Sequence, residues 1–311
     1  MANISPSKKA TIVSSSVAII LVIVKFAVGI ASGSVALLAS AIDSLLDSVV
    51  SIFNFFAIAK SEEKASDEYQ YGKGKVQAIA GVIEGTVITI SGLYIIYVSI
   101  QKALNGSTTT LLLPSIGVMV FSIIVTYFLV VYLLKIAKET DSIVIKADAL
   151  HYKTDLLSNG VILLSLGLVY FTKLDIIDAI FGFLIGIYII YSAYEIIEEG
   201  IEILLDKSLD KDIVDSIKEI LTNNKEVVSY HWLKTRTDGT TNFVEFHMVL
   251  RPNMLLLEAH RIADRIESNM MKLQKNKRWI ITPHFDPYDD EYINEANLHG
   301  ETVMEMEKRG E

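Results

Sequence analysis

Long apolar runs separated by short polar segments fill the first two thirds of the chain. A helix that crosses the hydrocarbon core of a membrane needs about 20 mostly apolar residues. Six stretches reach this length, near residues 10–32, 36–59, 77–101, 111–135, 143–171 and 176–204. The hydrophobic pattern therefore predicts a polytopic α-helical membrane protein with six transmembrane helices.

The first apolar stretch could also be interpreted as a signal peptide, because Lys8 and Lys9 precede it and small residues follow at 31–34. Its apolar run is longer than the core of a typical signal peptide, which has about 7–15 residues. We therefore interpret this stretch as a retained transmembrane helix.

The pattern changes after residue 205 to that of a small polar domain. Residues 210–224 and 255–274 are predicted helices, and the alternating segments 227–236, 241–250 and 278–285 are predicted strands. Asp238-Gly239, between the first two strands, is typical of a hairpin turn. The order α-β-β-α-β predicts a small α+β domain in which helices pack on a sheet.

These patterns divide the chain into four parts. We predict an N-terminal segment at 1–9, a membrane domain at 10–205, an α+β domain at 206–286 and a tail at 287–311. The tail carries eight acidic and two basic side chains. Such a composition predicts disorder.

Composition narrows the possible functions. The 311 residues are 51% hydrophobic, include no Cys and carry a net charge of −9. The lack of Cys excludes disulfides and Cys-based zinc or redox sites. The negative charge argues against nucleic acid as a partner, because phosphate binding needs clustered Lys and Arg.

Lysines between the predicted helices indicate the orientation in the membrane, since they concentrate on the cytoplasmic side. The polar segments that flank and connect the helices alternate between the two sides of the membrane. The segments on one side contain nine lysines: Lys8, Lys9, Lys60, Lys64, Lys73, Lys75, Lys135, Lys138 and Lys146. Those on the other side contain two, Lys102 and Lys173. Both termini are therefore predicted in the cytoplasm, with the loops near 33–35, 102–110 and 172–175 outside.

Ionisable residues inside two of the apolar helices are the candidate functional groups. The second helix contains Asp43-x-x-x-Asp47, and the fifth contains His151-x-x-x-Asp155. A spacing of four places both members of a pair on one helix face, and each charge is costly at the bilayer centre. A divalent cation between the helices would balance three carboxylates, and these O and N donors suit zinc or ferrous iron.

Other interpretations of these groups remain open. They could be separate from each other, cap helices or pair with Lys25. Lys25, Glu84 and Asp148 could line a water-filled cavity, form pairs or lie near an interface. Gly81-x-x-x-Gly85 and Gly182-x-x-x-Gly186 are typical of closely packed helices.

Histidines gather in the polar domain. His231 and His247 lie on the paired strands, His260 on the second helix, and His284 with Asp286 at the end of the last strand. Alternation places His284 and Asp286 on one face, and we expect the set to hold one or two zinc ions. His299, in the tail, is interpreted as an ordinary surface residue.

These motifs resemble those of the cation diffusion facilitator family, in particular its bacterial zinc and ferrous-iron efflux branch. The most specific segments are 34–48 (SVALLASAIDSLLDS), 71–75 (YGKGK) and 146–155 (KADALHYKTD). The resemblance extends to about residue 286. It implies a metallochaperone-like fold for the cytoplasmic domain and a homodimer in a bacterial or archaeal cell (inner) membrane.

The resemblance also implies residue roles. The chain would exchange cytoplasmic Zn²⁺ or Fe²⁺ for external protons, with no organic cofactor and no enzymatic activity. Asp43, Asp47, His151 and Asp155 would form the transport site. The regulatory site would be formed by His231, His247, His260, His284 and Asp286, and Lys75 with Asp206 would be a charge pair that holds the protomers together.

One departure from the family pattern concerns the loop between the second and third helices. The family pattern has a metal site there, and the matching positions are Ser66, Tyr69 and Lys73. Tyr is a poor zinc ligand and Lys adds positive charge, so we predict that this loop site is absent.

A membrane-anchored metal sensor without transport is the alternative function. An intramembrane hydrolase is less consistent with the sequence, because a catalytic metal keeps a position open for water and no His-Glu-x-x-His is present. The sequence does not choose among divalent metals, nor does it give the proton stoichiometry or the resting conformation.

Overall fold

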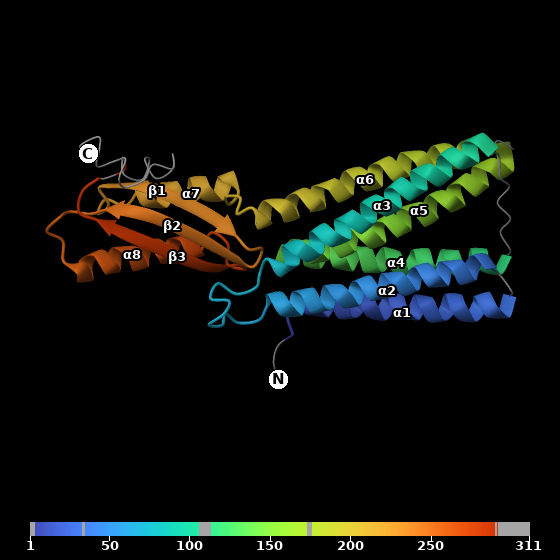
Figure 1. Ribbon diagram of the computed structural model, residues 1–311, viewed down its shortest axis with the longest axis horizontal. Helices are drawn as coiled ribbons and strands as arrows, with labels where there is room; N and C mark the ends of the chain where they lie inside the picture. Colours follow the sequence, from blue (N-terminus) through green and yellow to red (C-terminus); the bar gives the residue numbers. More distant parts are fainter. Residues whose placement is uncertain (1–3, 33–34, 106–112, 173–175, 290, 292–311) are drawn as a thin grey trace. The chain divides into compact units, whose positions relative to one another are not determined.

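A computed structural model describes residues 4–32, 35–105, 113–172, 176–289 and 291. The side chains of Asp43 and Lys102, within helices, lie outside this description, and so does the whole of Lys173. Most of the predicted external loops, His299 and nearly all of the tail also fall outside it. The chain forms two compact units, Met1–Leu205 and Asp206–Glu311 (Figure 1).

Six long helices form the first unit and coincide with the six predicted segments, which confirms that part of the fold. They are α1 (Pro6–Ser32), α2 (Val35–Ser61), α3 (Val76–Asn105), α4 (Leu113–Thr140), α5 (Ile143–Thr172) and α6 (Ile176–Leu204). In the described residues, all except α5 contain a span long and apolar enough to cross a membrane. The helix α5 differs because charged residues interrupt its first half.

The helix α5 lies among the others and contacts α1, α2, α3, α4 and α6. Its first turns are almost fully enclosed: Ile143, Val144, Ile145, Ala147 and Ala149 are at most 2% exposed. Protein therefore surrounds this part of the helix. Polar side chains are tolerated at membrane depth where they face the interior of a bundle in this way.

Glycines let α3 and α6 approach each other closely, as the Gly182-x-x-x-Gly186 spacing predicts. A Cβ built on Gly186 would lie 3.0 Å from the carbonyl oxygen of Gly92 and 2.5 Å from Cγ1 of Ile96. A Cβ on Gly92 would lie 3.2 Å from the carbonyl oxygen of Gly186. The two backbones are thus in direct contact, which only small residues permit.

The second unit has the predicted αββαβ order, which confirms the expected α+β fold. Its elements are α7 (Lys211–Thr222), β1 (Ser229–Thr237), β2 (Thr241–Val249), α8 (Leu256–Met271) and β3 (Arg278–Asp286). The central strand β2 pairs antiparallel with β1 and parallel with β3. The helix α8 provides the crossover that a parallel pair requires (Figure 1).

The hairpin between β1 and β2 turns at the predicted Asp238-Gly239. The Asp238 carboxylate accepts hydrogen bonds from the backbone N–H groups of Thr240 at 2.8 Å and Thr241 at 2.7 Å. Gly239 has φ of 91°, a conformation that glycine adopts without steric cost. This turn fixes the register of the two strands.

Apolar side chains from both helices and one face of the sheet form the core of this unit. Ile217 on α7, Ile262 on α8 and Phe246 on β2 are at most 2% exposed. Along β3, half-buried residues that face this core alternate with exposed ones. The opposite face of the sheet is therefore left available for polar chemistry.

The α3–α6 contact generates a stability prediction. Alanine gains roughly 1 kcal/mol over glycine in helix propensity, but in Gly186→Ala the new methyl group meets a backbone carbonyl that has little freedom to move. We expect a lower thermal unfolding temperature for Gly186→Ala in detergent, measured by scanning fluorimetry.

Gly117→Ala on α4 is the matched control, because a Cβ at Gly117 would have no described atom within 4 Å. This variant should unfold at the wild-type temperature or above it. A Gly186→Ala protein as stable as the control would mean that α3 and α6 are not in backbone contact.

Candidate metal centre

Three predicted ligands come together where α2 meets α5. Nε2 of His151 lies 2.9 Å from Oδ1 of Asp47 and 3.9 Å from Oδ2 of Asp155. One ligand atom of each residue lies within 4.8 Å of the other two. The helical spacing of four places His151 and Asp155 on the same face of α5, and that face meets Asp47 on α2.

The fourth predicted ligand, Asp43, lies on α2 one turn before Asp47. Its side chain is outside the described residues, so the structure places its backbone only. Lys25, an alternative partner for these acids, is 9% exposed, and its Nζ donates a 2.7 Å hydrogen bond to Ser44.

Three histidines lie in register across the sheet of the second unit. His231 on β1 is opposite His247 on β2, which is opposite His284 on β3. The ring centroids are 4.9 Å apart in the first pair and 4.5 Å apart in the second. Exposed His284 shows that this row lies on the side of the sheet away from the helices.

Asp286 connects the three histidines. Its Oδ2 lies 2.8 Å from Nδ1 of His247 and 3.5 Å from Nε2 of His231, and its Oδ1 lies 3.2 Å from Nε2 of His284. Asp286 and His231 are 6% and 3% exposed. A partly enclosed carboxylate with imidazoles on both of its oxygens has the geometry of a bridging metal ligand.

A bulge in β1 follows His231 directly. The pairing register shifts between His231 and Lys234, and Trp232 has φ of 53°. For a bulky residue this left-handed conformation is an outlier, and its position beside a predicted ligand shows that the strand is bent where His231 is held.

Asp289 is a nearby acid that the sequence did not single out. Its Oδ1 lies 3.6 Å from Nδ1 of His231. A hydrogen bond from Ser229 holds the pKa of Asp289 below its ordinary value, so it carries negative charge at neutral pH. Only its position shortly after the His284-x-Asp286 motif could have suggested it.

His260 is not brought into this cluster within the chain. It lies on an exposed face of α8, where its Nε2 is 3.7 Å from Asp264. The strand alternation that aligns the other histidines does not apply to a helix, so nearness in the sequence gave no information about its direction.

Lys75 and Asp206 belong to different units, so their charge pair between protomers stays a prediction. Within the first unit, Nζ of Lys75 donates to the carbonyl oxygen of Leu204 at 3.2 Å. Within the second, Arg236 lies 3.4 Å from Asp206.

The loop between α2 and α3 holds an ion pair at one of the family's ligand positions. Nζ of Lys73 is 2.9 Å from Glu63 and 4.5 Å from the centre of the Tyr69 ring, and Ser66 accepts a hydrogen bond from the Tyr69 N–H at 3.2 Å. Hydrogen bonds from Lys60 and then Lys73 lower the pKa of Glu63. A lysine, already paired with a carboxylate, therefore occupies one of the positions where the resemblance places a metal ligand.

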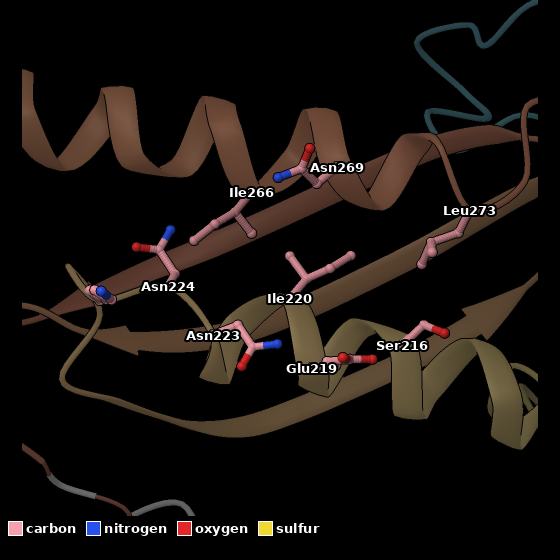
Figure 2. A pocket seen from close by; sticks show the side chains of 9 residues that line it. Ser216, Glu219, Ile220, Asn223, Asn224, Ile266, Asn269 and Leu273 are labelled. Atoms are coloured by element: carbon pink, nitrogen blue, oxygen red, sulfur yellow. The ribbon is translucent and has the colours of Figure 1, made fainter.

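A hollow of about 590 Å³ lies between α7 and α8 (Figure 2). It is lined by Ser216, Glu219, Ile220, Asn223, Asn224, Lys225, Ile266, Asn269 and Leu273. One carboxylate, no histidine and several amides do not make a site for a transition metal. Among the described residues, the groups that could hold a metal ion lie in the two clusters above.

Comparison with known proteins identifies both units. Residues 11–205 match the family model described as "Cation efflux transmembrane domain". Residues 209–288 match the model described as "Cation efflux protein, cytoplasmic domain".

Full-length relatives agree with these matches. The chain is 33% identical over 279 residues to proteins named "Cation-efflux pump FieF" from Salmonella arizonae and Salmonella choleraesuis, covering 90% of this chain and 92% of each relative. A solved structure titled "Metal-bound C-terminal domain of CzcD transporter from Thermotoga maritima" is 24% identical, with a TM-score of 0.24, and covers 25% of this chain and 94% of that one.

Two family models cover nearly the whole chain, and the similarity to the efflux pumps runs through both units. The chain belongs to the cation diffusion facilitator family and is a multi-pass membrane transporter for cation efflux.

Proposed function

We propose that the chain exports a divalent metal ion, Zn²⁺ or Fe²⁺, from the cytoplasm in exchange for protons. Asp43, Asp47, His151 and Asp155 hold the transported ion. The convergence of Asp47, His151 and Asp155 from two helices is the observation that carries this proposal.

The donor spacing supports an ion of this size. Tetrahedral zinc binds N and O donors at about 2.0–2.2 Å, which places neighbouring donors about 3.4 Å apart. The distances of 2.9 Å and 3.9 Å around Nε2 of His151 lie on either side of this value. Small side-chain adjustments would therefore complete the coordination, with Asp43 as the fourth ligand.

Proton exchange follows from the chemistry of these ligands. A carboxylate or imidazole binds metal only when deprotonated, so metal binding releases protons and protonation weakens binding. An unperturbed imidazole changes charge near pH 6.5, within the range of ordinary cytoplasmic and external pH. A site that opens to the cytoplasm captures the ion, and a site that opens outward exchanges it for protons.

We propose a homodimer with both termini in the cytoplasm, in a bacterial or archaeal cell (inner) membrane. The excess of lysine on one set of loops supports this orientation. Lys75 and Asp206 are proposed to pair close to the dimer contact at the membrane surface.

The histidine row of the second unit is proposed as a regulatory metal site. His231, His247, His284 and Asp286 supply imidazole and carboxylate donors on one side of the sheet. Metal bound there would tighten the dimer and bias the transport equilibrium, which is a coupling free energy between two sites. The role of His260 as a further ligand stays a prediction.

Replacing Asp47 by Asn tests the transport site. The substitution keeps size and an oxygen donor but removes the negative charge that faces His151. Even outer-shell substitutions lower metal affinity about 10- to 100-fold, so the loss of a direct ligand should abolish transport. Zn²⁺ uptake into proteoliposomes with an imposed pH gradient should fall to the level of empty vesicles.

Glu139→Gln, on an exposed position of α4, is the control and should retain wild-type uptake. Undiminished uptake by Asp47→Asn would remove this residue from the site. A wild-type protein that binds Zn²⁺ without any flux would favour the metal-sensor alternative.

Counting bound metal separates the two clusters. Purified full-length protein should lose its membrane-domain ion in the Asp43→Asn/Asp47→Asn double variant and its cytoplasmic metal in His247→Ala. The reason is that His247 lies at the centre of the histidine row. Elemental analysis after equilibrium dialysis gives the metal-to-protein ratio and the identity of the metal.

His299→Ala should leave that ratio unchanged, and His260→Ala decides whether His260 is a ligand. Equal metal content in His247→Ala and wild type would show that the row on the sheet does not bind metal.

A further inference from the structure

Two carboxyl groups inside the membrane domain lie apart from the transport site. Glu84 on α3 is 3% exposed and Asp148 on α5 is fully buried. Neither belongs to the group of Asp47, His151 and Asp155. The metal chemistry proposed above therefore leaves both acids without a role, although burying them is costly.

Neutral polar side chains from α2 contact these acids. Nδ2 of Asn54 donates a 3.0 Å hydrogen bond to Oε2 of Glu84, and Ser51 donates a 3.4 Å hydrogen bond to Oδ1 of Asp148. The Ser51 hydroxyl is also 2.9 Å from the hydroxyl of Tyr152. Asn54 and Ser51 are themselves fully buried, so water does not reach this group from their side.

Each acid keeps one oxygen without a hydrogen-bond partner. Among the described residues, no partner is present for Oε1 of Glu84, Oδ2 of Asp148 or Oδ1 of Asn54. Three buried acceptor atoms thus lie in one polar group, and none of them has a donor in hydrogen-bonding geometry. Buried acceptors of this kind are rare in proteins, because leaving them unpaired costs the full desolvation of the group.

No fixed positive charge balances the pair in the interactions of the described residues. Glu84 interacts with Asp148, His151 and Asn54, while Asp148 interacts with Ser14 of α1, Ser51, Asn54, His151 and Tyr152. His151 is the one group among these that can become a cation, and Asp47 and Asp155 already lie beside it. If both acids were deprotonated, the two buried carboxylates would repel each other.

We propose that Glu84 and Asp148, connected by Asn54, form a buried proton-binding site separate from the metal ligands. A proton on either acid removes one negative charge and turns an unpartnered acceptor into a donor. The site lies close to the metal centre, since Asp148 precedes His151 by three residues on α5, about one helical turn.

The function of this proton rests on the proposed metal–proton exchange. A divalent cation at His151 would repel a proton held one turn away, since charges interact strongly in a medium of low dielectric constant. Loading the metal would then favour release of this proton, and reprotonation would favour release of the metal. The pair would add to the proton coupling that the metal ligands provide by themselves.

Infrared spectroscopy tests the protonation directly. Purified full-length protein in lipid nanodiscs, free of metal at pH 7, should show the carbonyl stretch of a buried carboxylic acid. The band should disappear in Glu84→Gln or in Asp148→Asn, both of which keep the shape of the side chain. Glu198→Gln, an exposed residue on α6, should leave it unchanged.

Three results would overturn the proposal: no band in the wild type, a band that persists in both variants, or a band that appears only after Na⁺ is replaced by choline. The last result would mean that the group binds a metal cation. Asp148→Asn supplies the test if Glu84→Gln does not elute as a folded protein.

Proteoliposome flux separates this proposal from the proposed function. The ratio of proton counterflow to Zn²⁺ uptake should be lower in Glu84→Gln than in wild type. A wild-type protein that shows the band but transports no Zn²⁺ would refute the proposed function alone. Zn²⁺ transport by a wild-type protein without the band would refute the proton site alone.

Discussion

Ionisable side chains are stable inside an apolar helix bundle only when each is matched by an opposite charge, a hydrogen bond or a proton. The membrane domain is organised around this constraint. Helix α5 carries most of these groups and is surrounded by the other five helices. The contact between His151 and Asp47 joins α5 to α2, and Asn54 of the same α2 bonds to Glu84 of α3. Polar groups therefore connect α2 to both α5 and α3, while apolar side chains fill the space around them.

The second unit solves a similar problem with a sheet. One face carries the apolar residues that pack against α7 and α8, and the other carries the histidine row. Strand pairing aligns His231, His247 and His284 without any specialised loop. The bulge at Trp232 then bends β1 next to the first of them. A common scaffold thus presents closely spaced imidazoles on one face and packs an apolar core against the other.

Local patterns predicted most of the fold. The six apolar runs and the Asp238-Gly239 turn depend on neighbouring residues in the chain, which a single sequence displays. The spacing of four likewise identified Asp47, His151 and Asp155 as groups on defined helix faces. The sequence could not show that Asn54 meets Glu84 across two helices, because periodicity gives a face but not its neighbour. His260 shows the same limit, since it lies near the other histidines in the chain but points outward from α8.

The backbone contact between α3 and α6 limits how the membrane domain can change shape. At Gly92 and Gly186 the carbonyl oxygens lie where a neighbouring side chain would normally begin. No deformable layer separates the helices there, so sliding one along the other would force backbone atoms past each other. Shear between α3 and α6 is therefore unfavourable. Movements of α1, α2, α4 and α5 would therefore take place against a fixed pair.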